Sequence, residues 1–156
     1  MNIKIKIRYH NNVKHIEKIE KGDCIDLYVS KIEVKDDIVM FEFGISMQLP
    51  SGYSGRIYPR SSTFSKYGII LTNSVGIIDT SYCGDYDIWK AQFIHLEKSK
   101  ELPKVGDRIA QFEIVPNMNM TVMQKIKHLF VSGYSFDEVS ILGNKNRGGY
   151  GSTGNN

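Results

Sequence analysis

The sequence is poor in the residues that mark secreted, metal-stapled and membrane-spanning proteins. Its 156 residues include four prolines and two cysteines, Cys24 and Cys83. Two cysteines so far apart allow one disulfide at most and lack the close ligand spacing of a zinc site, which excludes a disulfide scaffold and a structural zinc centre. No stretch approaches the roughly 20 consecutive apolar residues of a membrane-spanning helix. Residues 1–11 alternate charged residues with isoleucine and lack the apolar run of a signal peptide, so we expect a cytoplasmic protein with reduced thiols and no membrane contact.

The rest of the composition is that of one ordinary folded domain. Hydrophobic residues make up 41% and charged residues 24% of a chain that is long enough to bury its own core. The net charge of +3 has its source in residues 1–21, which hold six basic and two acidic residues. The lysines there alternate with isoleucines, and no arginine cluster or aromatic ladder accompanies them. This pattern favours the solvated face of a strand, and we expect no direct nucleic-acid binding.

Alternation of apolar and polar residues is the strongest periodic feature, and it predicts strands. A first strand is expected at residues 3–9, with three isoleucines and a tyrosine on one face. The same alternation over residues 39–49 predicts one long second strand, ended by a Pro-Ser-Gly turn. Further short apolar runs lie at 56–58, 68–71, 75–78, 88–94 and 108–115. Many short strands joined by turns predict an all-β fold, either a barrel or a sandwich.

Residues 121–130 break this pattern with helical spacing. Their apolar residues recur every three or four positions, at Val122, Met123, Ile126, Leu129 and Phe130. We therefore expect one short amphipathic helix. Its apolar stripe is expected to pack on the protein's own core or on a neighbouring subunit rather than to recognise a partner.

Residues 143–156 are the least core-like part of the chain, with five glycines and almost no apolar residues. Such a segment adds little burial and loses much conformational entropy when it becomes ordered. We expect residues 1–142 to form a single β domain, with the helix in an insert at 117–135. Residues 143–156 are expected to form a glycine-rich C-terminal arm that is ordered when something binds.

Two turns combine arginine, hydroxyl groups and small residues, which is the chemistry that binds phosphate oxyanions. One is Pro59–Thr63 and the other is Arg147–Gly154. Neither matches the P-loop pattern, which excludes a Walker-type nucleotidase. Taken alone, each turn is equally consistent with an ordinary surface loop.

A carboxylate and an aromatic ring follow the apolar run at 75–78. Asp79 comes directly after it, and Tyr82 comes three residues later. A carboxylate at a strand end could activate a water, and a ring beside it could stack on a sugar or a base. Taken alone, a strand-capping aspartate and a packed tyrosine are the simpler interpretation.

Five segments, taken together in their order along the chain, favour a catalytic role for these residues over a purely structural one. They are Gly22–Leu27, Pro59–Ser62, Asn73–Gly84, Gly106–Gln111 and Arg147–Gly154. In order and spacing they resemble the five motifs of the trimeric dUTPase family, over residues 22–154. Five ordered matches are far more specific than any one of them. The resemblance implies a jelly-roll-type β-barrel and a homotrimer whose active sites lie between subunits.

The resemblance also implies a reaction, the hydrolysis of dUTP to dUMP and pyrophosphate with Mg²⁺ as cofactor. Such an activity limits uracil incorporation into DNA and supplies dUMP for thymidylate synthesis. In the family, a water attacks the α-phosphorus while the metal chelates the triphosphate. The protein's own contribution would then be positioning and charge neutralisation.

Residues that match family positions around the nucleoside take their roles from the resemblance. Asp79 matches the aspartate that orients and activates the attacking water. Tyr82 matches the tyrosine beneath the deoxyribose, whose ring leaves no room for a 2′-hydroxyl. The segment that reads the edge of uracil is matched by Asn73 and the backbone of Gly76, Ile77 and Ile78.

The phosphate and metal positions are matched in the same way. Ser61, with Arg60 and Ser62, matches the turn that holds the α- and β-phosphates. Gln111 matches the glutamine of the fourth motif, which lies near the phosphates. Asp26 matches the first-motif aspartate, which meets Mg²⁺ through coordinated waters, and Mg²⁺ characteristically keeps several waters.

The arm differs from the usual fifth motif in two ways. It is two residues shorter, and Tyr150 stands where phenylalanine is usual. Arg147 matches the arginine on the γ-phosphate. Tyr150, Ser152 and Thr153 would close over the nucleotide as a lid.

The resemblance leaves two features open. Tyr150, Tyr86 or Trp89 is expected to cover the uracil. The insert at 117–135 is longer than the usual link between the fourth and fifth motifs, and it would serve either trimer contacts or a protein partner.

Two other functions compete with this assignment. A dCTP deaminase shares the fold and a similar Arg-Ser-Ser turn, but its turn continues into Ala-Arg, whereas Thr63 and Phe64 follow here. It also needs a glutamate in the strand after the third motif, and none occurs between Asp79 and Glu97. The other alternative is a regulatory protein on this fold, in which nucleotide controls contact with a partner through the insert.

Overall fold

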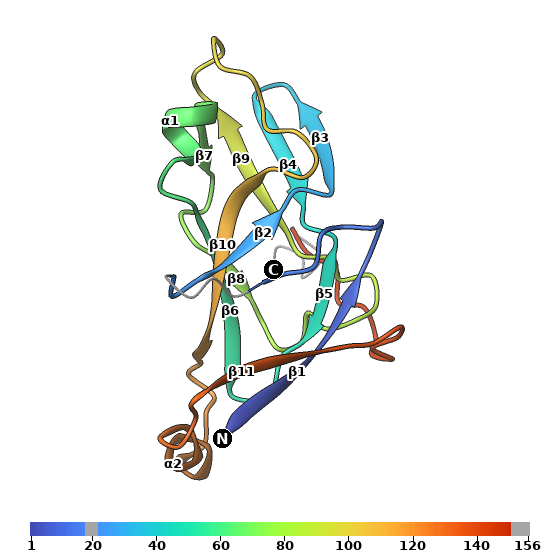
Figure 1. The fold of residues 1–156 in the computed structure, drawn as a ribbon, viewed down its shortest axis with the longest axis vertical. Coiled ribbons are helices and arrows are strands. Elements are labelled where there is room, and N and C mark those ends of the chain that lie inside the picture. The colour runs from blue at the N-terminus through green and yellow to red at the C-terminus, as the bar shows by residue number, and fades with distance from the viewer. Residues whose placement is uncertain (18–21, 151–156) are drawn as a thin grey trace, which may run out of the picture.

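The computed structural model describes residues 1–17 and 22–150, and it confirms the all-β expectation (Figure 1). The strands in this part of the chain are β1 (Asn2–Tyr9), β2 (Ile25–Tyr28), β3 (Lys31–Lys35), β4 (Ile38–Glu42), β5 (Ile45–Gln48), β6 (Tyr53–Pro59), β7 (Ile69–Leu71), β8 (Gly76–Ile78), β9 (Lys90–His95), β10 (Arg108–Pro116) and β11 (Gly133–Glu138). They form three sheets, with the orders β11-β1-β5, β2-β10-β6-β8 and β3-β4-β9-β7. Two short helices accompany them, α1 (Thr63–Tyr67) and α2 (Val122–His128).

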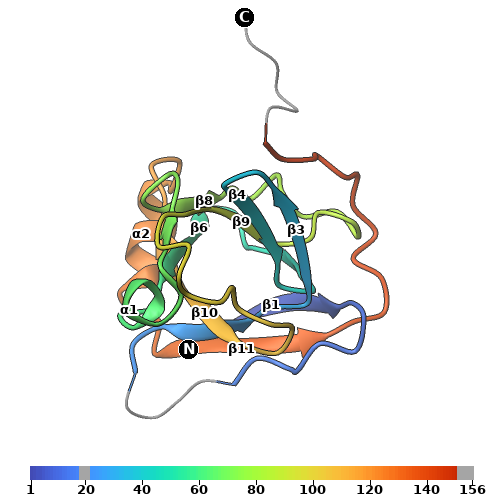
Figure 2. The same ribbon diagram turned by 90° about the horizontal axis from the view of Figure 1, so that it is seen from above.

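Strand β1, the first strand, lies beside β11, the last strand, in one sheet (Figure 2). It runs antiparallel to β5 and parallel to β11, with Asn2 opposite Gly133. Ile5 is buried, whereas Lys4 and Lys6 are exposed. The predicted alternation is therefore confirmed, and the basic face of this strand lies in solvent.

The single long strand predicted at 39–49 is wrong, because two strands occupy that segment. β4 pairs with β3 and β9, whereas β5 pairs with β1 in a different sheet. The break falls at Gly44, whose φ of 63° lies in the left-handed region. A Cβ at Gly44 would also lie 2.9 Å from the Cβ of Val13. Glycine at this position lets the chain pass from one sheet to the next, while the apolar residues on both sides stay buried.

The largest fully buried side chains of the core are aromatic. Trp89, Phe41, Phe93 and Phe112 are fully buried. The rings of Trp89 and Phe112 meet edge to face at 5.1 Å, and those of Phe41 and Phe93 at 5.5 Å. This core supports the sheet β2-β10-β6-β8, whose strand ends carry most of the predicted site residues.

The sequence predicts one helix, and the structure has a second, α1. It follows the serine-rich turn directly and ends at Gly68, whose φ is 64°. The hydroxyl of buried Thr63 donates to the carbonyl of Ile109 at 2.6 Å, which ties α1 to β10 and fixes the turn before it. Five residues are too few to give a helical period, so the pattern of this segment resembles that of a turn.

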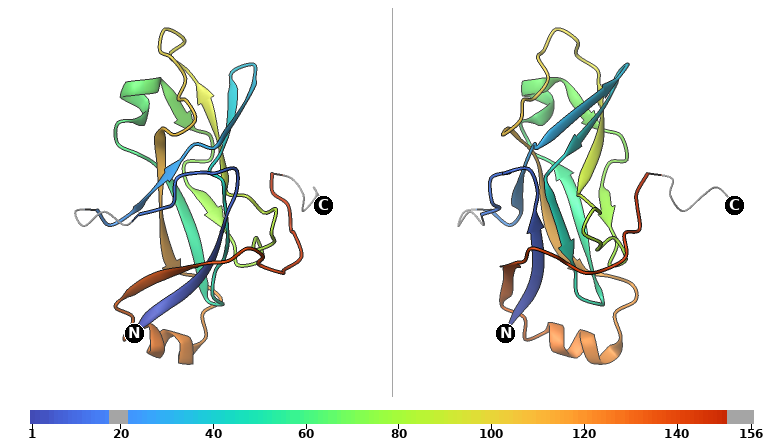
Figure 3. Two further views of the ribbon diagram at one scale, coloured as in Figure 1. Left: turned by 45° about the vertical axis from the view of Figure 1, so that its right-hand side comes forward. Right: turned by 90° about the vertical axis from the view of Figure 1, so that its right-hand side faces the viewer.

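Helix α2 lies where a helix was predicted, but its packing differs from the prediction. A capping box begins it, in which the Thr121 hydroxyl accepts from the main chain of Gln124 and the Gln124 side chain accepts from that of Thr121. None of its residues is buried, so the apolar stripe does not pack on the core of its own chain. Its attachments are polar: the Gln124 amide donates to the Ser51 carbonyl at 3.1 Å, and Tyr53 and His128 hydrogen-bond at 2.9 Å. It lies at one end of the molecule, beyond β1 and β11 (Figure 3).

Two further sequence expectations bear on the chain as a whole. Cys24 and Cys83 form no disulfide, in agreement with the prediction of free thiols. Within residues 1–17 and 22–150, no helix is long and apolar enough to cross a membrane. Cys83 lies in the loop between β8 and β9, next to the site described below.

Candidate active site

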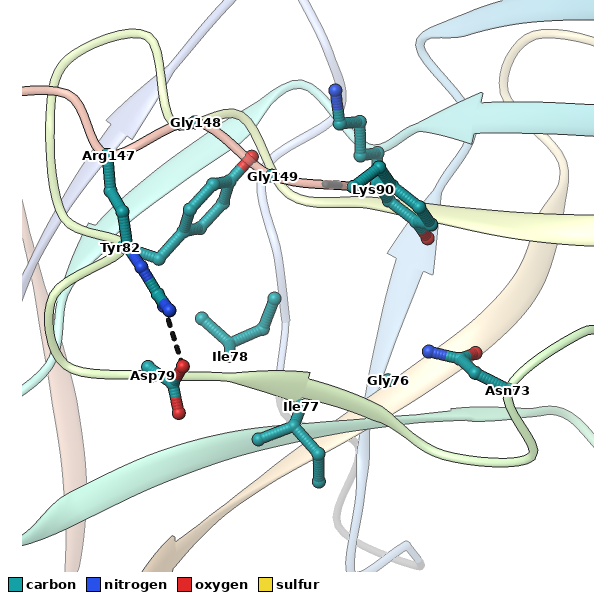
Figure 4. Close-up of a pocket in the computed structure, with 11 residues that line it drawn as sticks. Asn73, Gly76, Ile77, Ile78, Asp79, Tyr82, Lys90, Arg147, Gly148 and Gly149 are labelled. Carbon is teal, nitrogen blue, oxygen red and sulfur yellow. Dashed lines mark hydrogen bonds and ion pairs between the residues drawn. The ribbon is translucent and has the colours of Figure 1, made fainter. Parts of the chain in front are cut away.

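A cavity of about 270 Å³ is lined by the β8 region and the C-terminal arm, two segments far apart in sequence (Figure 4). It brings together most of the residues predicted to bind the nucleoside and to activate water. These residues are Asn73, Gly76, Ile77, Ile78, Asp79, Tyr82, Arg147 and Tyr150. The arm therefore reaches the β8 region in the fold, as the order of the motifs requires.

Strand β8 gives the cavity an open strand edge. It is the last strand in the order β2-β10-β6-β8, and among the described residues it pairs with β6 only. A strand edge presents N–H and C=O groups at fixed spacing, so it can hydrogen-bond the edge of a planar base as a partner strand would. Asn73 is exposed in the turn before β8 and adds a side-chain amide to this wall.

Asp79 and Arg147 form an ion pair between the end of β8 and the arm. The distance from Arg147 Nη1 to Asp79 Oδ2 is 2.6 Å, and the side chains are 34% and 53% exposed, respectively. A carboxylate open to water can accept a proton from it, and a guanidinium can neutralise phosphate charge. Ser152 and Thr153, the predicted lid residues of the same arm, lie outside the described residues.

The ring of Tyr82 forms a fixed wall of the cavity. Tyr82 is buried, and its hydroxyl donates to the carbonyl of Ile88 at 2.8 Å. Burial first, and the negative charge of Asp87 second, raise the pKa of Tyr82 above its ordinary value of 10.0, so the hydroxyl stays a neutral donor. Gly149 of the arm lies against the ring, and a Cβ there would be 3.5 Å from Tyr82 Cε2.

The three aromatic residues considered as a cover for the base occupy different places. Tyr150 lines the cavity, and its hydroxyl accepts from the main-chain N–H of Gln92 at 3.0 Å. Burial raises the pKa of Tyr150. Trp89 is fully buried in the core, and Tyr86 is 70% exposed outside the cavity lining.

A second group of predicted residues surrounds Asp26 on β2. Asp26 is buried, with Oδ1 2.9 Å from Arg60 Nε and Oδ2 3.0 Å from Arg108 Nη1. Gln111 lies opposite Asp26 on β10, and its side chain donates to the carbonyl of Pro59 at 3.4 Å. Two guanidinium groups around one carboxylate leave this cluster with excess positive charge, which suits a phosphate.

Asp79 and the cluster around Asp26 lie at opposite ends of strand β6. Gly55 pairs with Ile78, which places Asp79 beside the start of β6, whereas the turn Arg60–Ser62 follows its last residue, Pro59. A strand of seven residues spans roughly 20 Å. Within one chain, therefore, Asp79 and the Arg60–Ser62 turn cannot contact the same phosphate group.

The metal expectation concerns Asp26. Among the described residues, no three or more His, Cys, Asp or Glu side chains gather in a way that could hold a metal ion. Both carboxylate oxygens of Asp26 face arginines. A lone carboxylate beside two arginines would suit an Mg²⁺ that arrives on a triphosphate, because Mg²⁺ keeps several waters and would take its other ligands from the phosphates.

Three further residues at the site were not predicted from the sequence. Lys90 lines the cavity, with its Nζ 5.7 Å from the ring centre of Tyr150. Asp85 and Asp87 accept hydrogen bonds from the main chain of the arm. The Asp-Tyr-Asp sequence at 85–87, directly after the third motif, could have drawn attention to the two aspartates.

Taken together, the fold and the cavity define a class, an all-β protein with an open cavity that holds a carboxylate, a guanidinium and two tyrosine rings. Comparison with known proteins identifies the family within that class. The family model for dUTPase matches residues 24–132. An SPbeta prophage-derived deoxyuridine 5'-triphosphate nucleotidohydrolase of Bacillus subtilis is 40% identical over 155 residues, which covers 97% of this chain and 99% of the relative. The chain belongs to the dUTPase family; it is a dUTP diphosphatase and hydrolyses dUTP.

Solved structures agree on the fold. A dUTPase from Streptococcus mutans superimposes with a TM-score of 0.63 at 21% identity, covering 72% of this chain and 96% of that one. A mutant dUTPase from phage phi11 of S. aureus, described as coordinating a structural Mg(II) ion, gives a TM-score of 0.59 at 17% identity, covering 76% and 94%. At these identities the likeness shows a shared all-β fold.

Proposed function

We propose that this dUTP diphosphatase acts on Mg²⁺-bound dUTP at active sites that several copies of the chain build together. The supporting observation is the separation of roughly 20 Å between Asp79 and the Arg60–Ser62 turn. The activated water and the turn that holds the α-phosphate must meet at one phosphorus atom, so one chain cannot supply both. In a homotrimer, the Asp79 cavity of one copy would meet the Arg60 cluster of another.

The nucleoside would occupy the cavity between β8 and the arm. The open edge of β8 and the Asn73 amide would hydrogen-bond the uracil edge. The fixed ring of Tyr82 would lie beneath the deoxyribose and exclude a 2′-hydroxyl, because its hydroxyl is tied to Ile88 and the ring cannot move aside. Tyr150, already at the cavity, would cover the base.

Asp79 would take the proton from the attacking water. The water oxygen bonds to the α-phosphorus, the bond from that phosphorus to the bridging oxygen breaks, and pyrophosphate leaves. The ion pair with Arg147 holds the Asp79 carboxylate in place before nucleotide binds. On binding, Arg147 would turn to the γ-phosphate and leave the carboxylate free to act as base.

The phosphates would be held by the second cluster. Ser61, with Arg60 and the Ser62 backbone, would bind the α- and β-phosphates, and Gln111 would lie beside them. Mg²⁺, bound to the triphosphate, would neutralise its charge. Asp26 would face the metal's waters once phosphates draw Arg60 and Arg108 away from it.

The experiment that tests the reaction is pyrophosphate release from dUTP, dCTP, dTTP and UTP with Mg²⁺. We expect turnover of dUTP alone, and a fall of roughly 10²- to 10⁴-fold in the Asp79→Asn variant with dUTP binding retained. Asp37→Asn is the matched control, because Asp37 pairs with Lys98 away from the cavity and should leave the rate unchanged. Ammonia release from dCTP would instead identify a deaminase. An Asp79→Asn variant as active as wild type would reject the role of that carboxylate.

Mixing two inactive variants tests the shared site. Asp79→Asn removes the base, and Ser61→Asp places a repelling charge in an exposed turn. When the two are unfolded and refolded together, chance assembly would give about one site in four with both native residues if each site takes them from different copies. Recovered activity is the expected result. If the mixture stays inactive while each variant still assembles, Asp79 and Ser61 do not meet between copies.

A second function, regulatory binding to another protein, is favoured by the insert. The apolar stripe in and just after α2 is 48% to 79% exposed, at Val122, Met123, Ile126, Leu129 and Phe130. Residues 117–136 include two lysines and a histidine and no acidic residue. An apolar stripe with basic neighbours fits an amphipathic partner segment that has acidic flanks. Such a partner would bind away from the cavity, so it would add to hydrolysis rather than replace it.

Two designed helical peptides test this second function. Both carry a leucine face, one flanked by glutamates and the other by lysines. We expect the glutamate-flanked peptide alone to bind, and to lose binding to a Met123→Gln/Ile126→Gln variant. Equal binding of both peptides, or none of either, would reject an acidic partner for this surface.

A further inference from the structure

Asp87 is a buried carboxylate that the proposed chemistry does not use. It is 1% exposed and lies in the loop between β8 and β9. Its oxygens accept hydrogen bonds from the main-chain N–H groups of Gly84 at 2.9 Å, Arg147 at 2.8 Å and Gly148 at 2.8 Å. A buried charge is costly unless it is well hydrogen-bonded, and two of these three donors belong to the arm. The arm therefore completes the environment in which Asp87 is buried.

Asp85 repeats this pattern two residues earlier. It accepts from the main-chain N–H groups of Leu142 at 2.7 Å and Gly143 at 3.2 Å, and it pairs with Arg8 at 2.9 Å. The Leu142 N–H first, with Arg8 as a further cause, holds the pKa of Asp85 below its ordinary value. Both aspartates thus bind main-chain donors, which every residue except proline can supply.

The backbones of the loop and the arm approach each other closely at Gly84. A Cβ at Gly84 would lie 2.5 Å from the Cα of Asn146. The Asn146 side chain accepts from the N–H of Tyr86 at 2.8 Å, and the Asn144 amide donates to the carbonyl of Cys83 at 3.2 Å. A side chain at position 84 would collide with this backbone, so the loop is shaped to receive residues 142–148.

We propose that Asp87, assisted by Asp85, is a positioning residue for hydrolysis, because it anchors the arm so that Arg147 reaches the Asp79 cavity. Arg147 is held at both ends, by its main-chain N–H on Asp87 and by its guanidinium on Asp79. This inference rests on the proposed role of Arg147 and adds the part of the chain that fixes it. Since the anchor binds main-chain groups, it would receive the arm of its own chain or of a neighbouring copy alike.

Limited proteolysis tests the anchor without any nucleotide. In Asp87→Asn, the side chain keeps its shape but offers one acceptor oxygen and an NH₂ group that opposes the arm's N–H donors. Trypsin cleaves after lysine and arginine, and Lys145 and Arg147 lie in the anchored segment. We expect cleavage there to be roughly 10- to 100-fold faster than in the unmodified protein. Asp37→Asn is the matched control and should be cleaved at the original rate.

A second variant keeps the test valid if Asp87→Asn disturbs folding. Gly148→Pro removes one of the N–H donors to Asp87 and cannot adopt the φ of 75° found at Gly148. Gly148 is exposed and lies outside the core, so the β domain should fold as before. We expect the same acceleration of cleavage after Lys145. No cleavage is expected after Arg147 in this variant, because trypsin does not cut a bond that precedes proline.

Kinetics separate a positioning role from a purely structural one. If Asp87 acts through Arg147, Asp87→Asn lowers kcat/KM no further than Arg147→Ala does, and the double variant is no slower than Arg147→Ala alone. Additive losses in the double variant, or unchanged cleavage in both anchor variants, would overturn the inference. The cleavage assay needs no dUTP turnover, so an error in the proposed function would leave its result intact.

Discussion

Helix α2 and the C-terminal arm both lie outside the core, and both are attached by hydrogen bonds, α2 through side chains and the arm through its main chain. α2 carries an apolar stripe at helical spacing, yet none of its residues is buried. Residues 143–150 have almost no apolar side chains, yet their main chain donates to Asp85 and Asp87, and Arg147 reaches Asp79. The attachment of the arm is therefore decided by acceptors in the β8–β9 loop and not by an apolar pattern.

The physical reason lies in the direction of the two kinds of contact. Apolar burial is non-directional, so an apolar stripe indicates that burial would be favourable but does not indicate which surface the stripe packs against. A main-chain N–H must point at an acceptor within about 3 Å, so a few such bonds fix a segment in one place with little buried area. That kind of attachment suits an arm that opens and closes with each nucleotide. The stripe of α2 remains available to a surface outside this chain.

The largest expected effect is on the arm. Arg147→Ala removes the guanidinium that pairs with Asp79 and would meet the γ-phosphate, and we expect kcat/KM for dUTP to fall by roughly 10²-fold. Steady-state kinetics measure this loss. Lys145→Ala, a change of a neighbouring basic residue that does not line the cavity, is the control and should change the rate little. Equal losses in the two variants would mean that the arm acts through general charge and not through one anchored arginine.

The next largest effect is expected on the stability of helix α2. Thr121→Ala removes the capping box, which is worth about 1 kcal/mol, so amide exchange within α2 should speed up by roughly fivefold. Hydrogen exchange followed by mass spectrometry reports it, while dUTP turnover should stay unchanged. Met118→Ala, at a fully exposed position just before the helix, serves as control. If exchange in α2 stays the same in Thr121→Ala, contacts other than the cap hold the helix.

A smaller effect is expected on folding stability as pH falls, through His10, which is linked to Asp85 by way of Ser46. His10 hydrogen-bonds Ser46 at 3.0 Å, and Ser46 donates to the Asp85 carbonyl. Burial first, and the Arg8 charge second, lower the pKa of His10 below 6.5, so the folded state binds this proton less tightly than the unfolded state. His10 therefore favours folding fully above pH 6.5, and this contribution is lost as pH falls towards its lower folded pKa.

Thermal unfolding of the unmodified protein and of His10→Gln measures this contribution. We expect the melting temperature of the unmodified protein to fall more than that of His10→Gln between pH 7.5 and pH 5. Parallel curves would show that His10 is not the group that responds.

The smallest effect is expected from the apolar stripe itself. Replacing Val122, Met123 and Ile126 with glutamine should change the free energy of unfolding by less than about 0.5 kcal/mol, because these side chains face solvent in this chain. Denaturant unfolding measures it. A large loss of stability, or loss of the assembled oligomer, would break the comparison by showing that another copy covers the stripe.

Most of the fold and most residues of the candidate site can be predicted from the sequence, because the alternation of apolar and polar residues and the order of the motifs can be read directly along the chain. The sequence does not anticipate the break at Gly44, because the residues on both sides keep one alternating pattern while their pairing partners change sheets. It also cannot show that Asp79 and Arg60 fall at opposite ends of β6, since that depends on the register of β6 with β8. The anchor at Asp87 is missed because its ligands are main-chain groups, which every sequence carries.

The parallel pairing of β1 with β11 has a consequence for how the protein is made. β1 is synthesised well before its partner, which begins at Gly133, so one edge of β1 waits while the chain between the two strands is made. During that time the waiting edge is open to pairing with other chains. Its lysines, Lys4 and Lys6, give the waiting strand charges that resist such pairing. A chain that stopped before β11 would keep this edge exposed for good and would also lack the C-terminal arm.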